Sequence, residues 1–196
     1  AQKNLSMCSF RLFGLQKPKE EEVWSTEVTD EDLKNAVEDE FGVKYSKDWK
    51  RLLKAPLGLE GEYSIRKGVK VIGNRTFERC DSLTSINIPN GVTNIGDFAF
   101  TECRSLTCIN IPSRVTNIGE GAFAFCISLT NIDIPNNATN IGDSAFMCCK
   151  SFTNICIPDG VTNIGDKAFE DCKSLVSINI PNSVTNIGDN AFRDCI

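Results

Sequence analysis

The 196-residue sequence contains no histidine at all. Histidine is the side chain that most often serves as a general base or a metal ligand near neutral pH. Its absence excludes triads and dyads that need a histidine, zinc sites of the His-Glu-x-x-His type, and Cys/His zinc fingers. Ten cysteines are present, but no two are spaced as Cys-x-x-Cys. The sequence therefore predicts no metal site.

Signals for nucleotide binding and for catalysis by carboxylates are missing too. No Gly-x-Gly-x-x-Gly fingerprint or phosphate loop occurs, because the glycines follow another spacing. Neighbouring carboxylates do occur, at Glu20 to Glu22 and at Asp30, Glu31 and Asp32. They fall on a charged segment and on the first turn of an expected helix, so we interpret them as solvated groups rather than as a catalytic pair. We predict that the chain is not an enzyme and that it takes no cofactor.

Long apolar runs and basic stripes are also lacking. No stretch of 18 or more apolar residues occurs, so no membrane insertion is expected. Asp and Glu outnumber Lys and Arg by 26 to 21, which gives a formal net charge of −5. Nucleic acids and anionic lipids bind clustered cations, so neither is an expected partner. The start, Ala1-Gln2-Lys3-Asn4, lacks the segments of a signal peptide, which fits a mature secreted protein as well as a cytosolic one.

The sequence does contain a repeat of 23 residues. Cysteine, phenylalanine, glycine and proline each recur at this step over most of the chain. The cysteines are Cys80, Cys103, Cys126, Cys149, Cys172 and Cys195, and the phenylalanines are Phe77, Phe100, Phe123, Phe146, Phe169 and Phe192. Several columns of residues at one fixed period indicate stacked structural units, because a single short unit cannot bury its apolar face alone.

One unit, Ser82 to Cys103, shows how each repeat should fold. The alternation of Ile86 and Ile88 places both side chains on one face of a short strand, which Pro89 ends. Val92 and Ile95 are predicted to point inward from a second extended stretch. Ala99-Phe100 with Cys103 indicates a short helical or 3₁₀ turn, in which the phenylalanine fills the core. Strands of successive units should form parallel sheets.

These residues closely resemble the BspA-like, or Treponema-type, leucine-rich repeats. The pattern L-x-x-I-x-I-P-x-x-V-x-x-I-G-x-x-A-F-x-x-C matches residues 58–196. The resemblance implies a leucine-rich repeat solenoid, a right-handed superhelix of short parallel β-strands with irregular or short helical connections. It also implies a cell-surface or secreted protein that binds host proteins, such as matrix components, or other cells. The sequence departs from the pattern at Glu60, Tyr63, Arg66 and Thr76 in the first unit, and at Ala138 and Phe152 later.

We predict two regions. Residues 58–196 form the repeat domain, with a degenerate first unit at 58–80 and then units 81–103, 104–126, 127–149, 150–172 and 173–195. Residues 1–57 lack the period and form a small α+β N-terminal cap. Here Thr29 is expected to cap a helix whose apolar face includes Leu33 and Phe41. A hairpin follows around residues 46–48. The next residue, Trp49, stands at a position that is usually Gly in similar proteins.

Two columns admit structural and functional interpretations. The repeat cysteines are geometrically able to form disulfides between neighbouring units, but buried free thiols in a packing slot explain better why every unit keeps them. Cys8 stands alone in the cap. An asparagine column, Asn94, Asn117, Asn140, Asn163 and Asn186, forms either a hydrogen-bonded ladder or a polar binding strip, and we favour the ladder.

The candidate protein-binding surface is the outer face of the first strand of each unit, which we call the strand face. Its residues alternate with the inward isoleucines and are small, polar and nearly uncharged, so they are compatible either with weak binding or with an inert solvated sheet. They are Ser85, Asn87, Cys108, Asn110, Asn131, Asp133, Asn154, Cys156, Ser177 and Asn179.

Two functions follow as hypotheses. The first is a non-enzymatic, extracellular or cell-surface protein-interaction module, whose partner is a host matrix protein, a host surface protein or another cell. The alternative is a structural spacer that displays another domain or binds through its N-terminal cap. The last unit, which ends at Cys195-Ile196, has no following strand to cover it, so we also expect weak end-to-end self-association.

Overall fold

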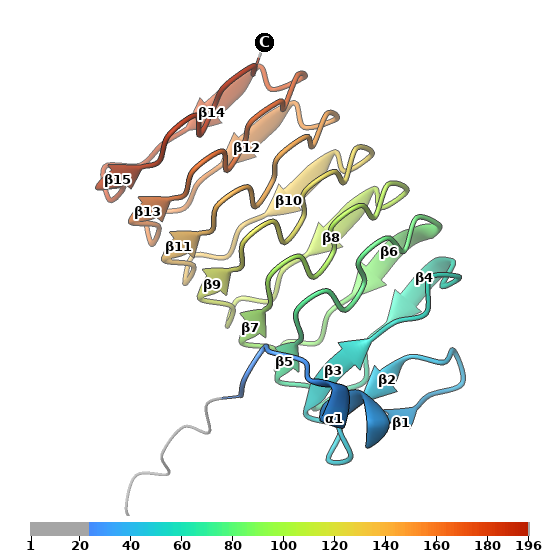
Figure 1. Cartoon of the computed structure of the whole chain (residues 1–196). Coiled ribbons are helices and arrows are strands. Elements are labelled where there is room, and N and C mark those ends of the chain that lie inside the picture. The colour runs from blue at the N-terminus through green and yellow to red at the C-terminus, as the bar shows by residue number, and fades with distance from the viewer. Residues whose placement is uncertain (1–23, 196) are drawn as a thin grey trace, which may run out of the picture.

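A computed structural model describes residues 24–195, and the predictions for Cys8 and for Glu20 to Glu22 lie outside this range (Figure 1). The chain forms one short helix and fifteen strands in this range. They are α1 (Asp30–Lys34), β1 (Val37–Glu38), β2 (Lys44–Tyr45), β3 (Arg51–Lys54), β4 (Gly61–Ser64), β5 (Val71–Ile72), β6 (Leu83–Asn87), β7 (Asn94–Ile95), β8 (Cys108–Asn110), β9 (Asn117–Ile118), β10 (Asn131–Asp133), β11 (Asn140–Ile141), β12 (Asn154–Cys156), β13 (Asn163–Ile164), β14 (Ser177–Asn179) and β15 (Asn186–Ile187).

The strands stack as coils of a solenoid, as the sequence predicts (Figure 1). Each coil contributes one strand to the even-numbered row, β4 to β14, and one two-residue strand to the odd-numbered row, β5 to β15. The register is the sequence period itself: Ile86 pairs with Ile109, and Ile95 pairs with Ile118, each 23 residues further on. All pairings between coils are parallel, which confirms the predicted fold class.

The third side of each coil is a series of turns, which is the irregular form of the connection expected from the sequence, and no α-helix forms there. In the unit around Phe100, the amide of Cys103 bonds back to Phe100 at 3.1 Å, but the amide of Phe100 bonds forward to Ala122 of the next coil at 2.8 Å. Phe98 and Glu102 have φ of 56° and 59°, which a right-handed helix does not allow. Bonding between coils therefore replaces bonding within a helix.

The core is a set of columns that run through the stack. Phe77, Phe100, Phe123, Phe146 and Phe169 are fully buried, and each ring stacks on the next. The centroids of successive rings lie 5.0–5.5 Å apart, with interplanar angles of 3–15°. Inward isoleucines, valines and leucines of both rows surround this stack, and no coil has a core of its own.

The repeat cysteines form a second buried column, and the nine described cysteines are free thiols. The Sγ of Cys103 donates to the carbonyl oxygen of Phe77 at 3.1 Å, and Cys126, Cys149 and Cys172 bond in the same way to the phenylalanine 26 residues earlier. Each thiol therefore satisfies a carbonyl of the coil before it. The arrangement agrees with a packing slot that also supplies a hydrogen bond.

The helix in residues 24–57 is shorter than predicted. Thr29 caps α1 as expected, in a capping box with Asp32. The helix ends at Lys34, however, because Asn35 turns the chain into β1, which pairs antiparallel with β2. Phe41 consequently lies outside the helix with an exposed fraction of 55%.

The predicted hairpin is present between β2 and β3, but its loop comprises residues 46–50 and is not a two-residue turn. Trp49 adopts φ of 60°, the left-handed conformation in which glycine costs least. Its ring packs on Tyr45, with centroids 5.1 Å apart, and the Arg66 guanidinium lies 3.9 Å from the ring centroid. These contacts offset the cost of a large residue at this position.

The N-terminal strands continue the repeat sheet. β3 pairs in parallel with β5, and Tyr45 and Leu52 belong to the same buried cluster as the repeat columns. The Tyr45 hydroxyl bonds to that of Tyr63, which in turn donates to Asp39 Oδ2 at 2.6 Å. The core is thus continuous across residue 57, and the division into a cap and a repeat domain stays a prediction.

Candidate functional site

The ten strand-face residues lie where the sequence places them. They come from β6, β8, β10, β12 and β14, and all are exposed except Ser85, which is half-buried. Register pairs bring them into two columns: Cys108 lies beside Asn131, and Asn110 lies beside Asp133. On the last two strands, Ser177 donates to Asn154 Oδ1 at 2.8 Å. The strand face is therefore a continuous polar strip with one charged residue, Asp133.

The hydrogen-bonded sheet beneath the strand face is divided. β4, β6, β8 and β10 form one sheet, β12 and β14 form another, and β10 and β12 are neighbours without ladder hydrogen bonds. The unit that contains β12 is the one in which Phe152 replaces the usual leucine. Phe152 is buried against Phe146, with ring centroids 5.8 Å apart. Because the larger ring occupies a leucine slot, we infer that it holds the two strands apart.

The asparagine column is a structural ladder over most of its length. Asn140 donates to Asn117 Oδ1 at 2.8 Å, Asn163 to Asn140 at 2.6 Å, and Asn186 to Asn163 at 2.5 Å. Since each amide already bonds to its neighbours, fewer donors and acceptors remain for a ligand. The interpretation favoured from the sequence is confirmed for these four residues.

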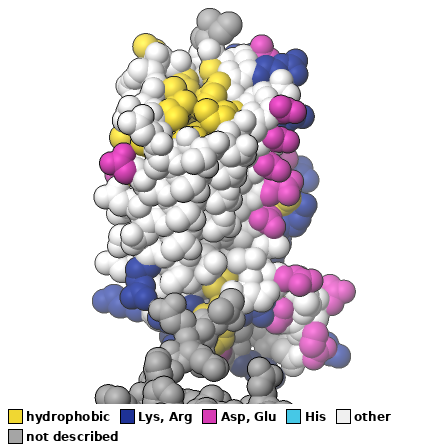
Figure 2. All heavy atoms as spheres, turned by 90° about the vertical axis from the view of Figure 1, so that its left-hand side faces the viewer, with side chains coloured by type: hydrophobic (Ala, Val, Ile, Leu, Met, Phe, Trp, Pro, Cys, Tyr) yellow, Lys and Arg dark blue, Asp and Glu magenta, His cyan; other side chains and the backbone are white. Residues whose placement is uncertain are grey.

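Two apolar surfaces lie at the ends of the stack. At one end, Phe41 and Leu57 have exposed fractions of 55% and 65%. At the other end, Ile180 and Ile187 of the last coil are 38% and 49% exposed, although their equivalents Ile157 and Ile164 are buried, and the outward Val176 is 84% exposed. Figure 2 shows hydrophobic side chains gathered near this C-terminal end.

Charge is unevenly distributed along the chain, which the net charge conceals. Residues 24–43 carry one Lys against seven Asp and Glu, residues 44–79 carry ten Lys and Arg against four Asp and Glu, and residues 80–196 carry six against twelve. Figure 2 shows dark blue side chains at the lower left and, along the right border, acidic side chains with dark blue ones among them that continue to the N-terminal end. Within residues 24–196, an excess of basic residues is therefore confined to residues 44–79.

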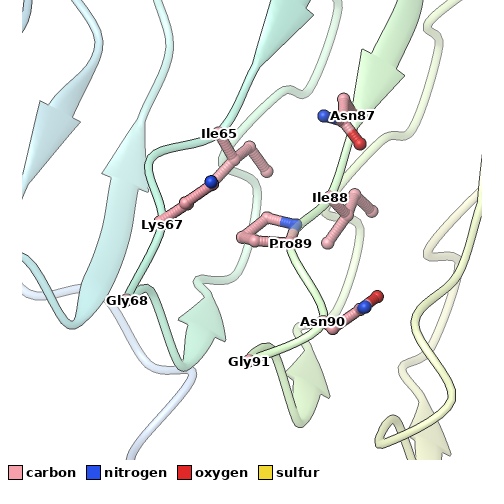
Figure 3. A pocket seen from close by; sticks show the side chains of 8 residues that line it. All are labelled: Ile65, Lys67, Gly68, Asn87, Ile88, Pro89, Asn90 and Gly91. Carbon is pink, nitrogen blue, oxygen red and sulfur yellow. The ribbon is translucent and has the colours of Figure 1, made fainter.

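A hollow of about 430 Å³ lies within the basic part, between the loops that follow β4 and β6 (Figure 3). It is lined by Ile65, Lys67, Gly68, Asn87, Ile88, Pro89, Asn90 and Gly91. Among these residues the sequence interpretation named only Asn87 as a surface candidate. The remaining lining residues could have been found from the degenerate first unit, in which Arg66 replaces the proline of the repeat and Lys67 follows it.

The thiols differ in environment. Cys108 and Cys156 are exposed on the strand face, whereas burial raises the pKa of Cys80 to about 11 and the pKa of Cys126 and Cys172 to about 12. A raised pKa keeps a thiol protonated and unreactive.

In the described part of the chain, no three His, Cys, Asp or Glu side chains are grouped to hold a metal ion. No helix in residues 24–195 is long and apolar enough to span a membrane.

Comparison with known families identifies the solenoid. The model of the BspA type leucine-rich repeat region matches residues 64–196 in six copies. The chain therefore belongs to the BspA-type leucine-rich repeat proteins, as the sequence resemblance implied. No curated protein matches the sequence.

Three solved structures extend this comparison. A leucine-rich cell surface protein of Faecalibacterium prausnitzii is 36% identical, with a TM-score of 0.70 over 74% of this chain and 39% of that one. A leucine-rich repeat protein of Bacteroides ovatus is 35% identical, with a TM-score of 0.66 over 81% and 42%. One from Treponema pallidum is 26% identical, with a TM-score of 0.68 over 86% and 89%. The chain thus spans about two fifths of the first two proteins.

Proposed function

We propose that this chain is a non-enzymatic, cell-surface or secreted module that binds proteins, and that it adheres to host or matrix proteins or to other cells through its strand face. The observation that carries the proposal is the strand face itself: ten polar residues held in two registered columns on a solenoid whose core is fully packed. A solenoid presents such a surface with little internal motion, so partner binding costs little conformational entropy.

The family supports this role. Leucine-rich repeat proteins serve in general as protein-interaction scaffolds, and the similar protein of Faecalibacterium prausnitzii is described as a cell surface protein. The strand face lacks tryptophan, tyrosine and arginine, the usual hot-spot residues, so each contact is weak. Adhesion then depends on many copies of the chain on one surface.

Binding to immobilised matrix proteins and to whole cells, with the chain displayed on beads, tests the proposal. A variant with Asn110→Lys and Asn131→Lys places long charged side chains in the middle of the strand face and should reduce bead attachment at least about tenfold. A matched variant, Ser113→Lys with Asn136→Lys, adds the same charge at exposed loop positions and should retain attachment. Equal attachment of the two variants would contradict a role for the strand face.

A second candidate is the spacer or scaffold that binds through its N-terminal region. The exposed Phe41 and Leu57 support it, because these large apolar side chains in the N-terminal region are accessible to a partner. A Phe41→Ser and Leu57→Ser variant should abolish attachment under this alternative and leave it unchanged under the first. Both residues are largely exposed, so the variant should fold.

A further inference from the structure

The hollow between the loops after β4 and β6 arises from two glycines at the same repeat position. Gly68 and Gly91 are 23 residues apart and face one another across neighbouring coils, and both line the hollow. Later units have Arg114, Asn137, Gly160 and Ser183 at this position, so two successive glycines occur here only within the repeat region. Gly68 has φ of 99°, which side chains rarely adopt, so the space is built into the backbone.

One ammonium group lines this space, and two more lie near the glycines that border it. The Lys67 side chain lines the hollow directly, and in Figure 3 it extends toward the gap between its own loop and Pro89. The Nζ atoms of Lys50 and Lys70 lie 4.0 Å from where a Cβ would stand on Gly68 and Gly91, respectively. The backbone links them as well, since the amide of Lys70 donates to the carbonyl of Lys50 at 2.7 Å.

None of these lysines forms an ion pair with a carboxylate within 4.0 Å among residues 24–195, although the charge of Lys50 acts on Asp48. Lys50 and Lys70 are half-buried, and Lys67 is exposed. Like charges on neighbouring loops repel each other, and an anion bound at the hollow would relieve that repulsion.

We propose that the hollow is a docking site for a carboxylate-bearing segment of a partner protein, in which an Asp or Glu side chain is held by Lys67, Lys70 and Lys50. Ile65, Ile88 and Pro89 supply an apolar wall for the neighbouring side chain of the partner, and Asn87 and Asn90 supply amides for its backbone. This inference rests on the proposal that the chain binds proteins, but it uses a surface separate from the middle of the strand face.

The lining favours a peptide over an anionic polysaccharide. Chains of sulfate or uronate groups need cations repeated along an extended track. Here the three lysines belong to two neighbouring coils, and the following coils carry an excess of acidic residues that would repel a long polyanion. A short acidic segment with apolar neighbours matches both the size of the site and its mixed lining.

Fluorescence anisotropy with a labelled peptide, three glutamates separated by single apolar residues, tests the proposal on the whole chain. The peptide should bind at low salt and dissociate at about 0.5 M salt. Its Gln analogue should not bind. The Lys67→Glu and Lys70→Glu double variant should bind about tenfold or more weakly. The matched variant with Lys150→Glu and Lys173→Glu carries the same net charge and should bind as the unaltered chain does.

The variant with Asn110→Lys and Asn131→Lys separates this site from the strand face, because it should lose bead attachment but keep the peptide. Equal weakening in both charge-reversal variants would show a response to net charge alone and overturn the proposal. Absence of peptide binding, or tighter binding of dextran sulfate with the same dependence on Lys67 and Lys70, would overturn it as well. Far-ultraviolet circular dichroism confirms that each variant is folded.

Discussion

At the scale of single residues, burial decides which cysteines can react. Cys108 and Cys156 point outward from the strand face, whereas the repeat thiols donate hydrogen bonds to carbonyls of the preceding coil. Burial also raises the pKa of Cys126 to about 12, and it raises the pKa of Cys149 as well. One residue type therefore serves as an inert core element in most places and as an exposed group in two.

We expect iodoacetamide at neutral pH to alkylate Cys108 and Cys156 rapidly and to leave Cys126 and Cys149 unmodified in the folded chain. Exposed thiols are accessible to the reagent, whereas buried protonated thiols are not. Peptide mass spectrometry before and after unfolding in urea measures this. Rapid labelling of Cys126 in the folded protein would contradict the buried column.

The same burial predicts a loss of stability in alkali. Below about pH 9 both the folded and the unfolded chain hold the thiol proton, so the stabilisation is complete. Above that pH the unfolded thiol ionises first, and the free energy of unfolding falls by about 1.4 kcal/mol per pH unit for each thiol until its folded pKa is reached. Urea titrations from pH 8 to 11 measure how steeply the unfolding free energy falls with pH. For Cys126→Ala this fall should be shallower than for the unaltered chain by the contribution of one thiol, about 1.4 kcal/mol per pH unit. Equal slopes would contradict the shifted pKa.

At the scale of elements, the phenylalanine stack and the strands depend on each other. A fully buried phenylalanine contacts rings in the coils before and after it, so its removal leaves a cavity that touches three coils. Phe125, only two residues from Phe123, is 38% exposed and lies outside the stack. How much a phenylalanine contributes to the free energy of unfolding therefore depends on its position within the coil.

The Phe123→Ala variant should lose about 3–5 kcal/mol of unfolding free energy because of the lost burial and the cavity. Phe125→Ala should lose less than about 1 kcal/mol, since its ring is already exposed to water. Urea denaturation followed by circular dichroism compares the two variants. Similar losses would mean that the rings do not form a packed column.

The gap in the strand row offers a second test at this scale. If Phe152 holds β12 away from β10, Phe152→Leu should let the ladder close and slow amide exchange at Asn154–Cys156. Hydrogen exchange followed by mass spectrometry measures the change, with the Leu129→Ile variant of the preceding unit as a control that keeps the slot aliphatic. Unchanged exchange in Phe152→Leu would show that another feature separates the strands.

How far the sequence could predict this structure also differs between elements. The register of β6 with β8 follows from the 23-residue period alone, because identical columns must stack to bury their apolar members. The turns at Phe98 and Glu102 could not be predicted, since their left-handed conformation is set by hydrogen bonds to the next coil. The strand face followed from alternation. The basic hollow did not, because it depends on two glycines and on lysines that approach from different loops.

At the scale of the whole molecule, the solenoid is a stack whose ends differ from its middle. Residues that are buried in inner coils are exposed in the last one: Ile164 is fully buried, whereas Ile187, its equivalent, is 49% exposed. Within residues 24–196, an excess of basic residues is confined to residues 44–79. Association through the last described coil stays a prediction.

We expect multi-angle light scattering to show a mass above that of a monomer at high protein concentration and a monomer on dilution. Val176→Lys with Ile187→Lys should remove the association, because charges replace the exposed apolar side chains of the last coil. The Phe41→Ser and Leu57→Ser variant alters the other end of the stack and should leave the association intact. A monomer at every concentration would refute end-to-end pairing.

The stacking of coils in chain order is the basis of the strand face, the hollow and both ends. Nuclear Overhauser contacts between the phenylalanine rings, resolved by selective labelling, test it most directly. The account predicts contacts of Phe123 with Phe100 and Phe146, whose ring centroids lie 5.2 and 5.5 Å away, and none with Phe77 or Phe169. Contacts that skip a coil, or rings without neighbours, would contradict the solenoid and the binding surfaces built on it.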